Sequence, residues 1–532
     1  MSTRSILFVD KIYQILYEGG SGLSKESFYV TTPIYYVNDV PHIGHAYSTI
    51  IADALARYKR LSGYDVLFLT GTDEHGQKVE KAAREWGRTP QEHCDLMVGP
   101  FKELWRKLNI SYDDFIRTTQ ERHIMVVQAI FQNLFSQGDI YKGFYEGWYC
   151  IHEETFYPES QLVEGCCPEC GRPVEWLKEE SYYFRSSKYQ DQLLQYIKDN
   201  PDFIRPDFRR NEVVSFIKSG VQDTSVSRTT FKWGIPVPFD PDHVVYVWFD
   251  ALINYLTGVG YLQDEEKTAK FWPADIHVIG KDIIRFHCVI WPMMLLSLGL
   301  PLPKQVLAHG FWMLGGAKMS KSTGVVVDPN RLIEEFGTDS IRYFLLREIA
   351  VGLDGEFTQD ALIRRLNGDL ANDLGNLVHR TVAMVMKYFD GEVPEAGELG
   401  ALETVLRDET IGLALVVDEL MNKTDIRGAL MQIWGVIARA NKYVDEAAPW
   451  ALAREGQTEQ LRTVMHTLLE TIRVIAILIS PVMPETAEKI WDQLGQSNFT
   501  SVTIEDARKW DMLALGTAVK KAAPLFPRVE IK

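Results

Sequence analysis

Two short stretches of this 532-residue chain carry side chains whose types and spacing suit phosphate chemistry. The first is His42-Ile43-Gly44-His45, which follows a β-forming run and precedes residues with a helical apolar pattern. A helix N-terminus offers unpaired backbone N–H groups and the positive end of the helix dipole, so it attracts an anion. His42 and His45 share one helix face and can both donate to one phosphate, while Gly44 lets a ligand approach the backbone closely.

The second stretch is Lys318-Met319-Ser320-Lys321-Ser322, a polar loop between apolar runs that end at Leu314 and resume at Val325. Taken singly, each stretch also fits a structural role, as capping histidines beside a turn or as a solvated hairpin. Together and in this order they are typical of one enzyme class. The chain resembles the class I aminoacyl-tRNA synthetases, and the flanking residues narrow the resemblance to the methionyl-tRNA synthetase family in its short bacterial or organellar form.

Composition limits the class of protein further. The chain is 46% hydrophobic and 24% charged, as expected of globular domains with substantial cores. Its net charge of -16 argues against nonspecific binding to nucleic acid. The charge is compatible with selective, salt-sensitive binding of tRNA through local basic patches. No apolar run reaches the length of a membrane span, and the cysteines do not resemble a secreted disulfide framework. We therefore expect a cytoplasmic protein that does not associate with a membrane.

Strand and helix patterns alternate from Phe28 onward and become purely helical after about Glu356. This predicts an α/β fold with a doubly wound parallel, Rossmann-like sheet, an inserted connective domain with a zinc-knuckle-like motif, and an all-α helix bundle. The predicted segments are a disordered leader at 1–27, catalytic halves at 28–145 and 241–356, the insert at 146–240 and the bundle at 357–532. We recognise no further dimerisation module and expect a monomer.

The resemblance implies an enzyme that ligates L-methionine to tRNA(Met), including the initiator tRNA, for translation initiation and elongation. It implies ATP and Mg²⁺, a methionyl-adenylate intermediate, and release of pyrophosphate and then AMP. Its catalytic residues match His42, His45, Lys318 and Lys321, which would stabilise charge on the phosphates. The implied ATP-binding residues are His42, Gly44, His45, Gly280, Asp282, Lys318, Ser320, Lys321 and Ser322.

The resemblance also assigns a methionine site, in which Asp73 holds the α-amino group and Arg228 faces the carboxylate or phosphate side. A thioether gains from aromatic ring edges, although such aromatics also serve as plain core residues. The implied residues are Ile34, Tyr36, Asp73, Arg228, Trp248, Leu252, Tyr255, Ile283 and His287. Many relatives have Pro or Ala where Leu252 stands. The run from Val244 to Phe249 is predicted as a strand, with a helix from Asp250.

Cys167 and Cys170 form half of a zinc knuckle, and Cys150 supplies a third thiol. Where relatives with zinc have a second Cys-x-x-Cys, this chain has Glu153 at the partner position and His152 beside it. Two alternatives remain open: a structural Zn²⁺ held by the three cysteines with Glu153 or His152, and a metal-free knuckle that packing holds in shape.

In the helical region the resemblance assigns anticodon contacts to Asn376, Arg380 and Trp450. A stacking aromatic flanked by hydrogen-bonding groups suits an unpaired base, whereas a surface pair and a helix-end plug are the plain alternatives. Two rival functions fit less well. A small adenylyltransferase of the same superfamily needs no helical domain, and a non-catalytic tRNA-binding paralogue has no need of the four catalytic side chains.

Overall fold

The structure is a computed structural model that describes residues 25–153, 155–314, 317–318 and 327–530. Most of the predicted leader therefore lies outside the described residues, as do Ser320, Lys321 and Ser322. The chain forms two compact units. Of the described residues, the first unit comprises those within Met1–Pro41, Leu67–Arg106 and Tyr112–His309, and the second those within His42–Val66, Lys107–Ser111 and Gly310–Lys532.

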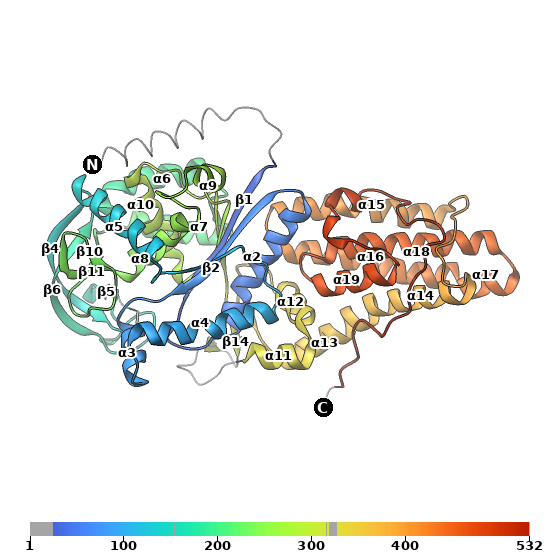
Figure 1. Cartoon of the computed structure of the whole chain (residues 1–532), viewed down its shortest axis with the longest axis horizontal. Coiled ribbons are helices and arrows are strands. Elements are labelled where there is room, and N and C mark those ends of the chain that lie inside the picture. The colour runs from blue at the N-terminus through green and yellow to red at the C-terminus, as the bar shows by residue number, and fades with distance from the viewer. Residues whose placement is uncertain (1–24, 154, 315–316, 319–326, 531–532) are drawn as a thin grey trace. The chain divides into compact units, whose positions relative to one another are not determined.

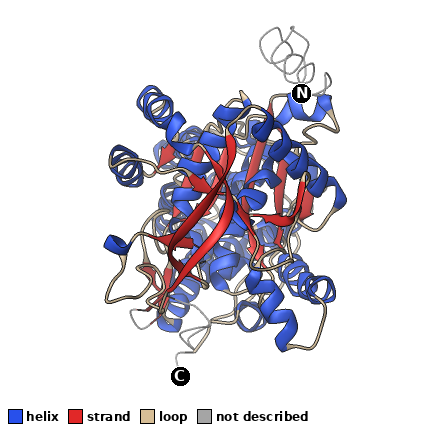
Figure 2. Ribbon diagram, turned by 90° about the vertical axis from the view of Figure 1, so that its left-hand side faces the viewer, coloured by secondary structure: helices blue, strands red, loops and turns tan. Residues whose placement is uncertain are grey.

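The first unit is built around a six-stranded sheet; Figure 2 colours the strands of this and of every other sheet red. Its strands, in spatial order, are β3 (Asp114–Arg117), β2 (Asp65–Asp73), β1 (Ser27–Tyr36), β12 (Ile276–Gly280), β13 (Gln305–His309) and β7 (Ile204–Arg205). β1 pairs in parallel with β12, β12 with β13, β13 with β7, and β2 with β3. The predicted Rossmann-like sheet is confirmed. Because the order reverses between β1 and β12, a ligand is expected at the carboxyl ends of these two strands.

Helices connect the strands of this unit: α3 (Gln77–Glu85), α4 (Pro90–Lys107), α5 (Glu121–Ser136), α6 (Gln190–Asp199), α7 (Asp207–Lys218), α8 (Val247–Gly258), α9 (Glu265–Phe271) and α10 (Trp291–Leu298). The predicted strand from Val244 to Phe249 is wrong in its second half. β11 (Asp240–Val245) ends early, Tyr246 is the extended N-cap, and α8 already begins at Val247. The β-forming side chains there are nearly all buried, so tertiary packing outweighs their strand propensity.

The predicted insert at 146–240 only partly forms a separate structure. An antiparallel sheet contains β5 (Thr155–Tyr157), β4 (Ile140–Cys150), β6 (Glu175–Phe184) and β8 (Thr224–Ser225), and a smaller one contains β10 (Pro236–Val237), β11 and β9 (Ser227–Arg228). The antiparallel sheet therefore starts before residue 146. Between these segments, β7 pairs with β13 at the edge of the main sheet, and Phe203 and Ile204 are fully buried. The segment around β7 therefore belongs with the nucleotide-binding fold, because the side chains of Phe203 and Ile204 are buried in the core of the main sheet.

The second unit is mainly helical, and Figure 1 shows its helices α14 to α19 in yellow to red. Its helices are α2 (Ile43–Leu61), α11 (Pro329–Phe336), α12 (Thr338–Arg347), α13 (Gln359–Arg365), a π-helix (Leu366–Gly375), α14 (Asn376–Tyr388), α15 (Ala401–Asn422), α16 (Ile426–Ala447), α17 (Pro449–Glu455), α18 (Thr458–Ile479), α19 (Pro484–Gln493) and α20 (Ile504–Ala507). The short strands β14 (Trp312–Leu314), β15 (Ala317–Lys318) and β16 (Gly355–Glu356) precede the bundle.

The predicted helix bundle is confirmed, and α18 is its central helix. From Thr463 to Ile479 every residue of α18 is buried, which is typical of a helix that other helices surround. The unit also contains α2, the helix that follows His42, which the sequence analysis placed with the catalytic half. The helix with the predicted phosphate-binding turn is therefore part of the same compact unit as the bundle.

Candidate active site

The turn at His42–His45 forms a capping box in which both histidines take part. His42 is the N-cap of α2, with extended backbone, and His45 is the third helical residue. The backbone N–H of Gly44 donates to Nδ1 of His42 at 3.0 Å, and the backbone N–H of His42 donates to Nδ1 of His45 at 3.1 Å. The two imidazole rings stack with centroids 3.9 Å apart. The turn is therefore fixed by its own side chains.

These hydrogen bonds decide which ring nitrogen of each histidine carries the proton. Because Nδ1 of each histidine accepts a hydrogen bond, the ring proton of each neutral imidazole must sit on Nε2. Nε2–H is a donor suited to a phosphate oxygen. Gly44 has a local reason as well as the predicted one, since a Cβ there would lie 2.9 Å from Cε1 of His42. The glycine lets the His42 ring fold back over the first turn.

A pocket in the first unit is lined by eight of the nine residues predicted to bind methionine. These are Ile34, Tyr36, Asp73, Trp248, Leu252, Tyr255, Ile283 and His287, joined by Pro33, Ala251 and Asn254. They come from the ends of β1 and β2, from α8, and from the 3-10 helix (Lys281–Ile283) and π-helix (Phe286–Ile290) that follow β12. Elements far apart in the sequence thus meet at the strand ends where the topology predicts a ligand.

One wall of the pocket is aromatic. Trp248 stacks on Phe286 with centroids 4.0 Å apart and meets Tyr36 edge-on at 6.4 Å. Deeper in the pocket, the Tyr255 hydroxyl lies 2.8 Å from Nε2 of His287, whose Nδ1 lies 3.0 Å from the carbonyl oxygen of Ile283. Burial lowers the pKa of His287 to about 4. The ring is therefore neutral at pH 7, donates from Nδ1 to Ile283 and accepts from Tyr255.

The turn that carries Asp73 is held by buried charged groups on both sides. The carboxylate of Glu74 accepts two hydrogen bonds from Arg117, at 2.7 and 2.9 Å. On the other side, His75 lies 2.7 Å from one carboxylate oxygen of Asp250. The second oxygen of Asp250 lies 2.7 Å from Nε2 of His123, on α5.

Burial would raise the pKa of Asp250, but the two neighbouring histidines lower it below its usual value. Asp250 is therefore an anion that ties the Asp73 turn to α8 and α5. Glu74, Asp250 and His123 were not predicted from the sequence, and neither were Asn254 in the pocket and Phe286, which stacks on Trp248. Their partners are distant in sequence, and a strand end rich in Asp, Glu and His was the only signal available.

Arg228, the ninth residue predicted to bind methionine, is buried but does not line the pocket. Its Nη1 donates to Oγ of Ser225 at 2.8 Å, and its guanidinium carbon lies 4.3 Å from the centroid of the Tyr246 ring. Its contact with a substrate carboxylate stays a prediction.

Two further ATP-site assignments also stay predictions. At the end of β12, a Cβ on Gly280 would lie 2.6 Å from an Asp282 carboxylate oxygen, so the carboxylate folds back over the turn. Lys318 belongs to β15, which pairs with β14.

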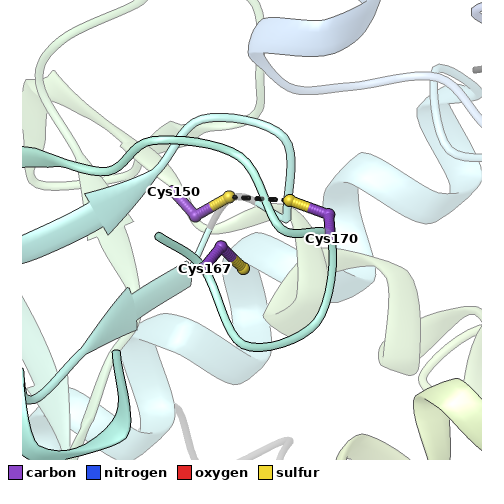
Figure 3. Close-up of side chains that lie close together, drawn as sticks. All are labelled: Cys150, Cys167 and Cys170. Carbon is purple, nitrogen blue, oxygen red and sulfur yellow. Dashed lines mark hydrogen bonds between the residues drawn. The ribbon is translucent and has the colours of Figure 1, made fainter. Parts of the chain in front are cut away.

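The three cysteines of the knuckle converge, as Figure 3 shows. Sγ of Cys150 and Sγ of Cys170 are 3.5 Å apart, and all three sulfur atoms lie within 4.8 Å of one another. The backbone N–H of Glu153 points at Sγ of Cys150 at 3.4 Å. Carboxylate and imidazole atoms of Glu153 and His152 lie within 4.8 Å of Sγ of Cys170. The side-chain donors of both candidate fourth ligands therefore lie near the thiol of Cys170, and thiolate, carboxylate and imidazole are ligand types that Zn²⁺ accepts.

The predicted anticodon residues Arg380 and Trp450 lie together although they come from α14 and α17. The guanidinium carbon of Arg380 is 5.8 Å from the centroid of the Trp450 ring, and Trp450 is 46% exposed. Asn376 is one turn before Arg380 on α14. Asp445, which the sequence analysis missed, accepts from Nη2 of Arg380 at 3.1 Å. An exposed ring with hydrogen-bonding neighbours can stack on an unpaired base.

Two family models match this chain. The class I tRNA synthetase (M) model matches residues 28–175 and 171–382, and the model of the anticodon binding domain of methionyl tRNA ligase matches residues 393–531. The chain belongs to the methionyl-tRNA synthetase family. The prediction made from the paired motifs is confirmed. This synthetase activates methionine with ATP and transfers it to tRNA.

Individual relatives of this chain are methionine–tRNA ligases, which agrees with the family models. The methionine–tRNA ligase of Caldanaerobacter subterraneus subsp. tengcongensis is 54% identical over 510 residues, which cover 96% of this chain and 80% of that protein. The Thermotoga maritima ligase is 48% identical over 95% of this chain and 81% of its own length. A solved structure of Mycobacterium tuberculosis methionyl-tRNA synthetase in complex with methionyl-adenylate superposes with a TM-score of 0.91 at 46% identity, covering 94% of this chain and 100% of that one. Among the described helices of this synthetase, none is long and apolar enough to cross a membrane.

Proposed function

We propose that the pocket around Tyr255 and His287 holds the methionine side chain, and that Asp73 at its rim holds the α-ammonium group. The observation that carries this proposal is the convergence of eight predicted residues on one pocket. Ring edges of Trp248 and Tyr36 suit the polarisable thioether, and neutral His287 avoids burying a charge against it. Exchange of labelled pyrophosphate into ATP that depends on methionine tests the assignment.

In the first step, a carboxylate oxygen of methionine attacks the α-phosphorus of ATP and the bond to pyrophosphate breaks. The transition state spreads negative charge over phosphate oxygens, so the protein acts by positioning and electrostatic stabilisation. The Nε2–H groups of His42 and His45 donate to the phosphates, and Lys318 and Lys321 neutralise the β- and γ-phosphates. Mg²⁺, when bound with ATP, adds positive charge among the phosphate oxygens.

Other residues hold the ends of the substrates during this step. The turn at Gly280 and Asp282 offers a carboxylate to the ribose hydroxyls, which donate to it. The predicted loop residues Ser320 and Ser322 offer hydroxyl groups to ATP, and Arg228 is assigned to the carboxylate side of methionine. No side chain acts as a covalent nucleophile.

In the second step, a hydroxyl of the terminal adenosine of tRNA attacks the carbonyl carbon of the adenylate, and AMP leaves. We expect both elongator and initiator tRNA(Met) to be substrates of a monomeric, cytoplasmic enzyme. Sedimentation of the purified chain tests the monomer, and charging of the two tRNA species tests the choice of substrate.

We infer that Trp450, Arg380 and Asn376 bind the anticodon. Trp450→Ala is expected to lower kcat/KM for tRNA charging by about 10- to 100-fold, since stacking on one base contributes about 1–3 kcal/mol. Methionine-dependent exchange without tRNA should not change. The two rates are measured on the same preparation.

Trp86→Ala is the matched control, because Trp86 is also exposed and Arg88 lies 5.4 Å from its ring centroid. This variant should charge tRNA normally. Equal losses of charging and exchange in Trp450→Ala would contradict the anticodon assignment.

We propose that the knuckle holds one structural Zn²⁺ through Cys150, Cys167 and Cys170, with Glu153 or His152 as the fourth ligand. Metal analysis of protein purified without chelators should find about one zinc per chain, and Cys167→Ser should abolish it. Glu153→Gln and His152→Asn then distinguish the fourth ligand. Zinc-free protein that is folded and active would favour the knuckle held by packing alone.

A further inference from the structure

A single buried guanidinium in the second unit, that of Arg342 on α12, contacts three segments of the chain. Its donors reach the carbonyl oxygens of Val482 at 2.8 Å, Pro481 at 3.0 Å and Leu108 at 3.1 Å, and an Asp53 carboxylate oxygen at 2.6 Å. The side chains of Arg342 and Asp53 are both fully buried. Pro481 and Val482 form the turn between α18 and α19, and Asp53 lies on α2. We call Arg342, Asp53 and these carbonyl groups the Arg342 cluster.

The α2 end of the cluster is fixed on every side. The other carboxylate oxygen of Asp53 accepts from the backbone N–H of Ser111 at 2.7 Å and from its hydroxyl at 2.6 Å. Arg57, one turn further along α2, donates to Asp53 at 2.8 Å. Burial would raise the pKa of Asp53, but Arg342, Arg57 and Ser111 lower it below its usual value. Asp53 is thus an anion with a full set of partners.

The bundle end of the cluster is fixed as well. Asp339, also on α12 and 5% exposed, accepts from the backbone N–H of Thr486 at 2.6 Å in the first turn of α19. α12 packs against α2, α16 and α19, and Figure 1 labels all four helices. Two buried polar side chains of α12 therefore bind neighbouring parts of the bundle: Arg342 binds the α18–α19 turn and also α2, and Asp339 binds the first turn of α19.

The same helix α2 begins with the His42–His45 turn. Asp53 lies about three turns, or roughly 16 Å, after the cap. A tilt of about 4° at the cluster would move the cap by about 1 Å over that length, and a misplacement of this size can lower a rate by about 100-fold. We propose that Arg342 is a positioning residue for the adenylation step, which sets the direction of α2 by tying Asp53 to the α18–α19 turn of the tRNA-binding bundle.

This proposal rests on the proposed role of the His42–His45 turn, and it differs from a purely structural role in one measurable way. Substitution of a residue that only stabilises the fold lowers the fraction of active molecules. Substitution of a residue that positions α2 lowers kcat per active molecule. The methionine pocket belongs to the first unit, so KM for methionine should stay the same.

The chain provides a matched control in Arg473 of α18, which is also buried. Arg473 donates to the carboxylate of Glu470 at 2.8 Å and to the carbonyl oxygens of Asp506 and Lys509 at 2.8 and 2.5 Å. These partners all lie in the bundle and the segment after it. Lysine at either position keeps the charge but cannot reach all the acceptors that the planar guanidinium reaches.

The test compares Arg342→Lys with Arg473→Lys. Active sites are counted by the burst of adenylate, and kcat for pyrophosphate exchange is expressed per active site. We expect both variants to melt at lower temperature than the unsubstituted chain. Only Arg342→Lys should lose about 10- to 100-fold in kcat per site, with KM for methionine unchanged.

If Arg342→Lys does not fold, Asp53→Asn serves as a second variant, because asparagine keeps the side-chain shape of aspartate. This variant should also lose kcat per active site, by a smaller factor. Normal kcat per active site in either folded variant overturns the proposal, and so does an equal loss in Arg473→Lys. The unsubstituted chain separates the two claims. If the unsubstituted chain does not catalyse exchange with methionine, the proposed function fails. If it does, the positioning role of Arg342 is judged from the ratio of the variant rate to the unsubstituted rate.

Discussion

Lys321→Ala is expected to lower the rate of methionyl-adenylate formation by about two to three orders of magnitude, with little change in methionine affinity. The ammonium group is assigned to charge that builds on the β- and γ-phosphates as pyrophosphate leaves, so its removal costs most in the transition state. Single-turnover formation of adenylate, with methionine and ATP saturating, measures this rate directly. Methionine affinity is measured separately by equilibrium binding.

Lys423→Ala is a suitable control, because Lys423 is an exposed lysine paired with Glu419 on α15, in the bundle. Its adenylation rate should equal that of the unsubstituted chain. The role of Lys321 would be wrong if Lys321→Ala lost methionine binding while the enzyme that still bound methionine reacted at the normal rate.

His45→Asn is expected to lower adenylate formation by about 100-fold and to leave the start of α2 intact. The amide oxygen of asparagine can replace Nδ1 as acceptor for the backbone N–H of His42, but asparagine has no donor at the place of Nε2. The expected loss is that of one donor to a developing phosphate charge. The free energy of unfolding should stay within about 0.5 kcal/mol of the original value.

His45→Gln reverses the exchange, because when its amide nitrogen reaches toward the place of Nε2, its amide oxygen is not placed to accept from the backbone N–H of His42. This variant should keep more of the rate and lose about 1 kcal/mol of stability, roughly the net contribution of one hydrogen bond. The two variants thus separate capping from catalysis. An active His45→Asn, or an inactive variant with a lowered stability, would show that capping is the only role of the ring.

The position of the candidate site could be predicted from the sequence because its strongest signals are local. A β-forming run, a capping turn and a helical pattern follow one another at His42, and all three are decided by near neighbours. The pocket residues were found through the family resemblance, and the structure brings eight of them together. Their individual roles remain predictions that the experiments above address.

The groups that hold the site in place could not be read from the sequence. Asp250 looked like the first residue of an ordinary helix, and its bonds to His75 and His123 join positions 175 and 127 residues apart. Arg342 carried no signal in the sequence, yet it is fully buried against four acceptors. Long-range pairing of buried polar groups leaves no periodic pattern, since only the folded chain decides which groups meet.

One predicted strand–helix boundary was wrong for a related reason. The start of α8 at Val247 was predicted as strand because Val, Trp and Phe favour strands in isolation. The extent of the insert was predicted from the place where the strand–helix alternation weakens, yet β7 returns a two-residue strand to the main sheet. A strand that short has too few residues to show alternation.

The most direct test of this account is pyrophosphate–ATP exchange, measured with each of the twenty amino acids, with Mg²⁺ and without tRNA. Exchange should occur with methionine and stay at background with the other nineteen, because the pocket combines an aromatic wall and a neutral imidazole with Asp73, the proposed anchor of the amino group. Exchange with a different amino acid instead, or no exchange from folded protein, would contradict the methionine pocket.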